Sequence, residues 1–221
     1  EIEEFNMPKS VKNIGYGAFF NCKSLTNIDI PKGITSINQN VFEYCQNLTE
    51  VDLPKSVTSI EDNAFKGCQN LQKIYIPKDV TSIGKSAFVG CESLTKIEIP
   101  AAVQTIGEEA FEGCSSLEKV VIPENVTELG YNTFRKCDNL TEIVIPKYLS
   151  KDEFRTMHLA RSKSQEIPDI LYDDEKHPNK AIEASTEDAA KAVADTALAK
   201  NNSFFSKLKS FFGNIFHFSY Q

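Results

Sequence analysis

The stretch VFEYCQNL occupies residues 41–48, and AFKGCQNL follows at residues 64–71, 23 residues later in the same order. Other residue types return at this interval, which is the signature of a repeat architecture. The proline column contains Pro8, Pro31, Pro54, Pro77, Pro100, Pro123 and Pro146. Three further columns hold Phe19, Phe42, Phe65, Phe88, Phe111 and Phe134; Cys22, Cys45, Cys68, Cys91, Cys114 and Cys137; and Leu25, Leu48, Leu71, Leu94, Leu117 and Leu140. The chain therefore contains six complete units of 23 residues.

Each unit ends in an apolar and polar alternation, as in Leu-Thr-Lys-Ile-Glu-Ile-Pro at residues 94–100. This alternation predicts a strand with one buried face, which proline then ends. One unit cannot bury its own apolar face. Stacking the units at a strand spacing of about 4.7–4.9 Å joins their strands into a parallel sheet and their apolar columns into one core. The sequence therefore predicts a solenoid.

All cysteines stand in one column, so they occupy equivalent places in successive coils. A column that points inward demands one size and polarity, and cysteine is a small and often buried side chain. Zinc needs ligands that converge at short spacings, which a 23-residue interval without companion histidines does not supply. The spacing between coils would permit a disulfide, whereas the common direction of the side chains disfavours one. We interpret the column as packed, buried thiols.

Units such as LTKIEIPAAVQTIGEEAFEGCSS (94–116) resemble the BspA-like, Treponema-type leucine-rich repeats, which share the 23-residue length and the Pro, Ile-Gly, Ala-Phe and Cys landmarks. The likeness covers about residues 1–149, with Val41 and Thr133 in place of Ala, Leu129 in place of Ile, and Asn38 and Glu61 in place of Gly. This resemblance implies an α/β, right-handed leucine-rich repeat solenoid with a parallel β-sheet on its concave face. It also implies adhesion or protein binding, commonly on the surface of host-associated microbes, and no catalytic residues.

The chain divides into four predicted segments. Residues 1–149 form the solenoid, which begins with a truncated unit, so that further coils are expected before Glu1. Residues 150–163 carry a capping box and a short apolar pattern that predict a helical C-terminal cap. Residues 164–182 contain prolines and an acidic run, which is typical of a linker. Residues 183–221 are predicted to be a helical tail with an amphipathic end rich in phenylalanine.

The tail places its apolar side chains on one helical stripe. These residues are Phe204, Phe205, Leu208, Phe211, Phe212, Ile215 and Phe216. The favoured interpretation is a helix that packs against the solenoid or a second chain, and the alternatives are a helix on a membrane surface or an unfolded tail. No stretch is long and apolar enough to span a bilayer.

Composition argues against several functions. The formal net charge of −7 lacks the excess of positive charge that a nucleic-acid partner requires. The three histidines, His158, His177 and His217, lie beyond the repeats without a neighbouring nucleophile or metal-ligand pattern. No phosphate-binding or metalloprotease motif occurs. We therefore expect no enzyme, no cofactor and no metal site.

The outward residues of the aligned strands should form a binding surface, because extended sheets are the usual contact surfaces of solenoids. The candidate residues are Asp29, Asp52, Lys73, Tyr75, Lys96, Glu98, Lys119, Val121 and Val144. Val121 and Val144 are expected to be exposed apolar positions. Tyr75 is the leading candidate for an anchor, because binding energy concentrates in residues such as Tyr and Arg.

Two functional hypotheses follow. The first is a protein-binding or adhesive module at the cell surface, which binds a protein partner such as a host or matrix protein on its strand face. The alternative is a cytoplasmic scaffold or assembly subunit that docks through its C-terminal amphipathic helix, since six free thiols suit a reducing compartment. The sequence leaves the oligomeric state open.

Overall fold

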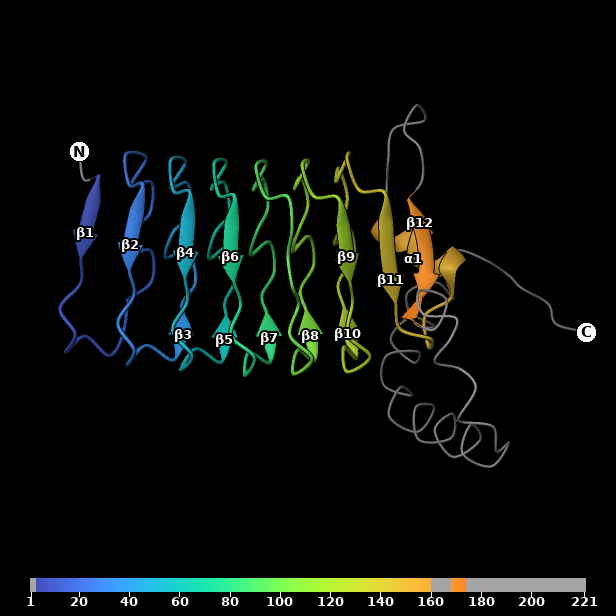
Figure 1. Cartoon of the computed structure of the whole chain (residues 1–221), viewed down its shortest axis with the longest axis horizontal. Coiled ribbons are helices and arrows are strands. Elements are labelled where there is room, and N and C mark those ends of the chain that lie inside the picture. The colour runs from blue at the N-terminus through green and yellow to red at the C-terminus, as the bar shows by residue number, and fades with distance from the viewer. Residues whose placement is uncertain (1–2, 160–167, 174–221) are drawn as a thin grey trace, which may run out of the picture. The chain divides into compact units, whose positions relative to one another are not determined.

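The computed structural model of the protein describes residues 3–159 and 168–173. These residues belong to one compact unit, Glu1–Asp173. Its coils stack side by side in the order of the sequence (Figure 1). In the described part of the chain, no helix has both the length and the apolar character needed to cross a membrane.

The strands predicted from the repeat lie on one side of the stack (Figure 1). They are β1 (Glu4–Asn6), β2 (Asn27–Asp29), β4 (Glu50–Asp52), β6 (Lys73–Tyr75), β9 (Lys119–Val121) and β11 (Glu142–Ile145). Neighbours pair in parallel between residues 23 positions apart, as Glu50 does with Lys73. The unit between β6 and β9 has no strand of its own at this position. It pairs with the next unit only through a single β-bridge between Lys96 and Lys119. The parallel-strand solenoid is therefore confirmed.

A second parallel sheet was not predicted. Its strands are β3 (Ser36–Ile37), β5 (Ser59–Ile60), β7 (Ser82–Ile83), β8 (Thr105–Ile106) and β10 (Glu128–Leu129), which form one uninterrupted five-stranded sheet. Each strand has only two residues, with the second one buried. A strand this short cannot show the alternation that reveals strands in a sequence.

Stacked phenylalanines run through the core. The rings of Phe42, Phe65, Phe88 and Phe111 are fully buried, and successive centroids lie 5.3 Å apart with interplanar angles of 3–17°. The backbone N–H of each of these residues donates to a carbonyl of the following coil, as Phe65 does to Ala87 at 2.8 Å. The column is uniform because each coil presents the same side chain at the same height.

Glycines follow three strands of the second sheet, where neighbouring coils approach most closely. A Cβ atom on Gly84, Gly107 or Gly130 would lie within 3.0 Å of backbone atoms of the preceding coil. Only glycine fits these positions. At Gly15, the equivalent residue of the first coil, a Cβ atom would meet nothing within 4 Å.

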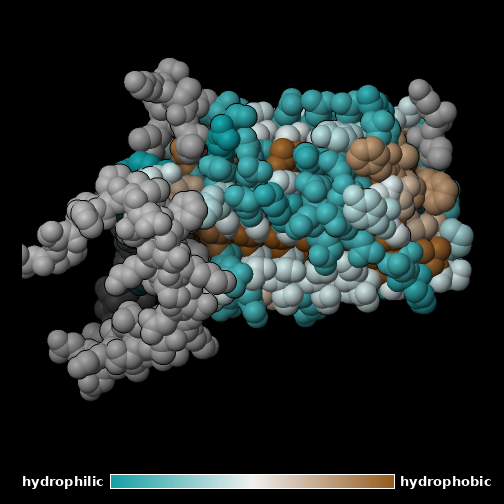
Figure 2. Space-filling view, turned by 180° about the vertical axis from the view of Figure 1, so that it is seen from behind, coloured by the Kyte–Doolittle hydropathy of each residue, from teal (hydrophilic) through white to brown (hydrophobic). Residues whose placement is uncertain are grey.

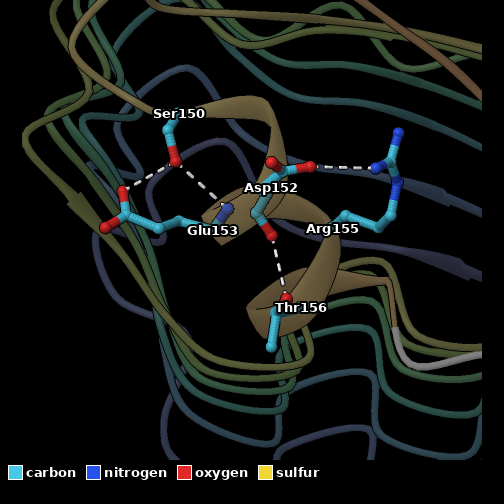
Figure 3. Close-up of polar contacts among 5 residues, drawn as sticks. All are labelled: Ser150, Asp152, Glu153, Arg155 and Thr156. Atoms are coloured by element: carbon cyan, nitrogen blue, oxygen red, sulfur yellow. Dashed lines mark hydrogen bonds and ion pairs between the residues drawn. The ribbon is translucent and has the colours of Figure 1, made fainter. Parts of the chain in front are cut away.

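Helix α1 (Lys151–His158) begins with the predicted capping box (Figure 3). The backbone N–H of Glu153 donates to the Ser150 hydroxyl at 3.1 Å, and that hydroxyl donates to the Glu153 carboxylate at 3.0 Å. Arg155 also pairs with Asp152 at 3.1 Å (Figure 3). The first of these contacts satisfies a backbone N–H that the start of a helix would otherwise leave unpaired.

Helix α1 takes the place of a further coil at the phenylalanine column. Phe154 is fully buried and its ring lies 6.3 Å from that of Phe134. The N–H of Phe134 donates to the carbonyl of His158 at 3.1 Å, which continues the ladder made by the earlier phenylalanines. The last carbonyls of a helix lack partners within the helix, so they are free to accept these bonds.

The prediction of a linker over residues 164–182 is wrong for part of that range. Strand β12 (Asp169–Tyr172) pairs in parallel with β11, with Asp169 opposite Glu142 and Leu171 opposite Val144. Its Ile170 is buried in the core. The acidic and proline-rich flanks masked a short apolar segment, which covers the edge that β11 would otherwise expose. The rest of the predicted linker and the tail lie outside the described residues.

Candidate binding surface

The candidate surface is the strand face, which we define as the outward side chains of β2, β4, β6, residues 95–98, β9 and β11. The three-residue strands β2, β4, β6 and β9 each bury the central residue and expose the residues on either side, as β4 buries Val51 between Glu50 and Asp52. The parallel register then lines up equivalent residues of successive coils in columns. The first column contains Asn27, Glu50, Lys73, Lys96, Lys119 and Glu142, and the second contains Asp29, Asp52, Tyr75, Glu98, Val121 and Val144.

Three lysines occupy successive places in the first column. Lys96 and Lys119 are directly paired across neighbouring coils, and Lys73 precedes them by one unit. Like charges placed directly opposite each other on a sheet are destabilising. The fold therefore tolerates a local concentration of positive charge in a chain whose net charge is −7.

Carboxylates offset two of these lysines. Glu98 lies 2.5 Å from the Lys96 ammonium group and Glu142 lies 3.4 Å from that of Lys119. The hydrogen bond that Lys96 donates to Glu98, and then the negative charge of Glu98, raise the pKa of Lys96. In the described part of the chain, Lys73 has no carboxylate within 4.0 Å. The centre of the strand face thus keeps one unpaired ammonium group beside two ion pairs.

Tyr75 and Val121 supply exposed apolar surface on the same face. Tyr75 is 59% exposed and lies in register with Asp52, while Val121 is 42% exposed. A large aromatic side chain gains free energy when a partner removes it from water. The structure places both residues on the strand face, as the sequence predicted.

The prediction that Val144 is exposed is wrong. Val144 is 1% exposed and lies between Val121 on one side and Leu171 on the other. The sequence treated the strand of Val144 as the last of the sheet. Strand β12 adds a further strand beside β11 and places Leu171 next to Val144, where the sequence expected the sheet to end.

Apart from Tyr75 and Val144, seven residues of the strand face were predicted to bind a partner, and all seven are exposed. They are Asp29, Asp52, Lys73, Lys96, Glu98, Lys119 and Val121. The predicted docking residues of the tail lie outside the described residues. They are Phe204, Phe205, Leu208, Phe211, Phe212, Ile215 and Phe216.

The cysteine column packs inward, and its thiols also donate hydrogen bonds. The thiol of Cys45 donates to the carbonyl of Phe19 in the preceding coil at 3.1 Å. The same contact joins Cys68 to Phe42, Cys91 to Phe65, Cys114 to Phe88 and Cys137 to Phe111 at 3.1–3.3 Å. Five of the six cysteines are buried and Cys22 is half-buried. Our interpretation from the sequence was that these thiols only pack in the core. The structure shows that they also donate hydrogen bonds to the preceding coil.

Burial keeps four of these thiols protonated. Desolvation raises the pKa of Cys45 to about 12 and the pKa values of Cys68, Cys91 and Cys114 well above the ordinary thiol value. A protonated thiol is neither a nucleophile nor a metal ligand. In the described ranges, no group of three or more His, Cys, Asp or Glu residues is placed to hold a metal ion.

An aromatic cluster at the N-terminal end was missed in the sequence. Tyr16 is 70% exposed and Phe20 is 50% exposed, and the Phe20 ring meets that of Tyr44 edge-on at 6.0 Å. Tyr44 has a φ angle of 62° where the next coil has Gly67. A bulky residue rarely adopts this conformation. Figure 2, which views the molecule from behind, shows hydrophobic residues gathered at this end. Aligning the repeats would have revealed this, because Tyr44 stands where the next three coils have glycine.

The architecture defines a parallel-strand repeat solenoid with a uniform interior and a varied outer face. The chain belongs to the BspA-type leucine-rich repeat family, because the family model of six repeats matches residues 1–100 and 35–164. No curated protein shows a significant match to the chain.

Several solved structures share the fold. A leucine-rich cell surface protein from Faecalibacterium prausnitzii is 35% identical with a TM-score of 0.59, and the match covers 64% of this chain. The leucine-rich repeat protein of T. pallidum is 25% identical with a TM-score of 0.54, over 84% of this chain and 85% of that one. The pneumococcal vaccine antigen PcpA, 24% identical with a TM-score of 0.50, shares the fold over 66% of this chain and 39% of its own. The match spans only 38% of the F. prausnitzii protein.

Proposed function

We propose that the chain is a protein-binding module that acts at the cell surface and holds its partner on the strand face. The observation that carries this proposal is the exposed Tyr75 on β6, which pairs in parallel with β4, beside Lys73, which has no carboxylate within 4.0 Å among the described residues. A rigid scaffold lowers the entropic cost of binding, because its side chains are already aligned. Exposed aromatic residues next to charged groups are typical of the centre of an interface.

The charge pattern indicates the chemistry of the partner. Lys73, Lys96 and Lys119 offer positive charge at the centre, and Asp29 and Asp52 offer negative charge toward the N-terminal coils. A partner that presents acidic groups to the lysines would relieve the repulsion within the column. Its apolar side chains would then cover Tyr75 and Val121.

The comparisons support a binding role at the cell surface. The family and its solved neighbours are leucine-rich repeat proteins, and the F. prausnitzii neighbour is a cell surface protein. Within the described residues, ion pairs such as Lys85 with Glu108 and Lys96 with Glu98 lie along the outer surface of the coils, where a binding partner could meet them.

A double substitution of Tyr75 and Lys96 to alanine tests this function. The immobilised chain would capture proteins from a host-cell surface extract, and each retained protein would be compared between the wild type and the variants. We expect Tyr75→Ala with Lys96→Ala to lose the retained partner, because it removes both the apolar anchor and the central charge. The melting temperature should stay unchanged, since both side chains are exposed.

Tyr16→Ala is the matched control, because Tyr16 is an exposed tyrosine away from the strand face. It should retain the partner. Equal capture by all three chains would refute the proposed surface. Labelling of intact source cells with an antibody against the repeats tests the location, and labelling that appears only after lysis would refute a surface position.

A further inference from the structure

A hollow of about 570 Å³ lies at one corner of the first two described coils. It opens where β1 and β2 end, and it includes Asn6 and Asp29, which face each other in register. Its volume falls within the range of small-ligand sites. The hollow shares Asp29 with the strand face, includes Asn6 at the end of β1, and takes its other lining residues from the segments that follow β1 and β2.

Gly33, in the lining of the hollow, stands where two later coils carry a polar side chain that bonds to the preceding coil. In the next coil, the hydroxyl of Ser56 lies 2.8 Å from the Lys32 carbonyl and 2.5 Å from the Ile34 carbonyl, so it ties this corner to the preceding coil. Asn125 makes the equivalent bond to the Ala101 carbonyl at 2.8 Å. Gly33 has no side chain to make such a bond. The corner between the first two coils therefore lacks this bond.

Three lysines line the hollow: Lys9, Lys12 and Lys32. Lys12 lies across the open corner, because a Cβ atom on Gly33 would be 2.7 Å from its ammonium nitrogen. In the part of the chain that the structure describes, no carboxylate lies within 4.0 Å of any of these three ammonium groups. Three unpaired cations around one cavity create a local positive potential in an acidic protein, which attracts an anion.

The remaining lining restricts the kind of anion. The Asp29 carboxylate would repel a bare inorganic anion, but it accepts hydrogen bonds from hydroxyl groups, as does the amide oxygen of Asn6. Met7, Ile30 and Pro31 add apolar surface that an inorganic ion cannot use. The lining thus combines cations, hydrogen-bond acceptors and an apolar wall.

We propose that this hollow binds an acidic carbohydrate. Its sulfate or carboxylate groups lie against the lysines, its hydroxyl groups donate to Asp29 and Asn6, and the C–H face of its ring covers the apolar wall. This activity is separate from protein binding on the strand face, because the lysines and Gly33 lie outside that face.

Titration calorimetry of the whole chain tests the ligand class with three probes. A heparin-derived tetrasaccharide carries sulfates, carboxylates and hydroxyls, maltotetraose carries hydroxyls alone, and sodium sulfate carries charge alone. We expect saturable binding of the heparin fragment with one site per chain, weakened by salt, and no binding of maltotetraose. Sodium sulfate at equal ionic strength should not reproduce this binding. If sulfate saturates the hollow as tightly as the tetrasaccharide, or if the tetrasaccharide does not bind, the proposal fails.

Two variants test whether the hollow itself holds the ligand. Lys12→Gln combined with Lys32→Gln removes two of the cations and should weaken binding about tenfold. Gly33→Ser keeps all three lysines, but it adds the hydroxyl that closes the corner in the next coil. Its Cβ atom would displace only the flexible end of Lys12, so the fold should be retained. We expect Gly33→Ser to weaken binding by a similar factor.

Lys55→Gln is the matched control, because Lys55 follows Pro54 as Lys32 follows Pro31 but does not line the hollow. It should bind the tetrasaccharide like the wild type. Unchanged binding by Gly33→Ser, or an equal loss in Lys55→Gln, would show diffuse attraction to surface lysines and would overturn the proposal. Circular dichroism and thermal melting of every variant separate a loss of binding from a loss of folding. If Gly33→Ser does not fold, the comparison of the Lys12→Gln, Lys32→Gln double variant with Lys55→Gln decides the test.

Discussion

The second sheet and the strand face are built from the same repeat, yet their outer side chains differ. Four strands of the second sheet carry small hydroxyl side chains; the Ser59 hydroxyl donates to the Glu61 carboxylate at 2.7 Å and lies 3.0 Å from the Ser36 hydroxyl. The strand face carries long charged and aromatic side chains such as Lys73 and Tyr75, which extend into solvent. The second sheet is uninterrupted over five strands, whereas the strand face is divided among three smaller sheets.

The difference separates residues that join coils from residues that remain available to a partner. On the second sheet, hydroxyls bond to the neighbouring coil, and glycines allow the close approach that follows β7, β8 and β10. On the strand face, the inward residues such as Val51 and Ile74 hold the coil, while the outward ones vary from coil to coil. Substitutions should therefore affect stability on the second sheet and recognition on the strand face.

The largest expected effect is at the glycines beside the second sheet. Gly107→Ala adds a Cβ atom within 3.0 Å of the backbone of the preceding coil, so the two coils must separate. We expect a loss of about 4 kcal/mol in the free energy of unfolding, measured by urea denaturation. Gly15→Ala, at the open equivalent position, should be neutral or slightly stabilising. Equal stability of the two variants would contradict the assigned close approach.

The next effect concerns pH and the contact between α1 and the end of the second sheet. Burial lowers the pKa of His158 to about 4, while a hydrogen bond with the Gly130 backbone opposes this shift. Because the unfolded pKa is near 6.5, folding is favoured by neutral His158 above that pH, and this stability is lost as the pH falls from about 6.5 to 4. The loss should reach about 3 kcal/mol.

The measurement is the difference in unfolding free energy between the wild type and His158→Leu from pH 7.5 to 4. This difference cancels the titration of carboxylates that both chains share. We expect the wild type to lose its advantage over the variant as the pH falls. A difference that stays constant over this range would show that His158 is not held neutral.

The smallest effect compares one outward residue of each sheet. Ser59→Ala removes two hydrogen bonds from a half-buried hydroxyl, so we expect a loss of about 1 kcal/mol in the free energy of unfolding. Lys73→Ala on the strand face should change it by less than about 0.5 kcal/mol, because its side chain is exposed. Thermal unfolding of both variants checks this order. A greater loss in Lys73→Ala would reverse the assigned roles of the two sheets.

Much of this architecture was predictable because the repeats of one chain can be aligned with each other, which shows which residues are equivalent. Once Phe42 and Phe65 share a column, parallel stacking places every later phenylalanine at the same depth. The same reasoning correctly placed Tyr75 and Lys96 on one face. The second sheet escaped prediction because two residues such as Ser82 and Ile83 are too few to show a period.

Features outside the repeat were predicted less well. The capping box at Ser150 was recognised because its pattern is local to one helix turn. Strand β12 was missed, since its pairing with β11 joins residues separated by helix α1 and a further segment of chain. The exposure of Val144 was predicted wrongly for the same reason.

The amino-acid sequence by itself determined the 23-residue winding, the inward columns and the identity of the strand face, because each follows from residues at a fixed spacing. Only the tertiary structure decided the contacts between residues that are not equivalent in the repeat. It decided that α1 and β12 complete the stack, that Val144 is buried, that Tyr44 adopts a glycine conformation, and that Gly33 lines a hollow among lysines. These features depend on contacts between non-equivalent residues, which no periodic pattern encodes.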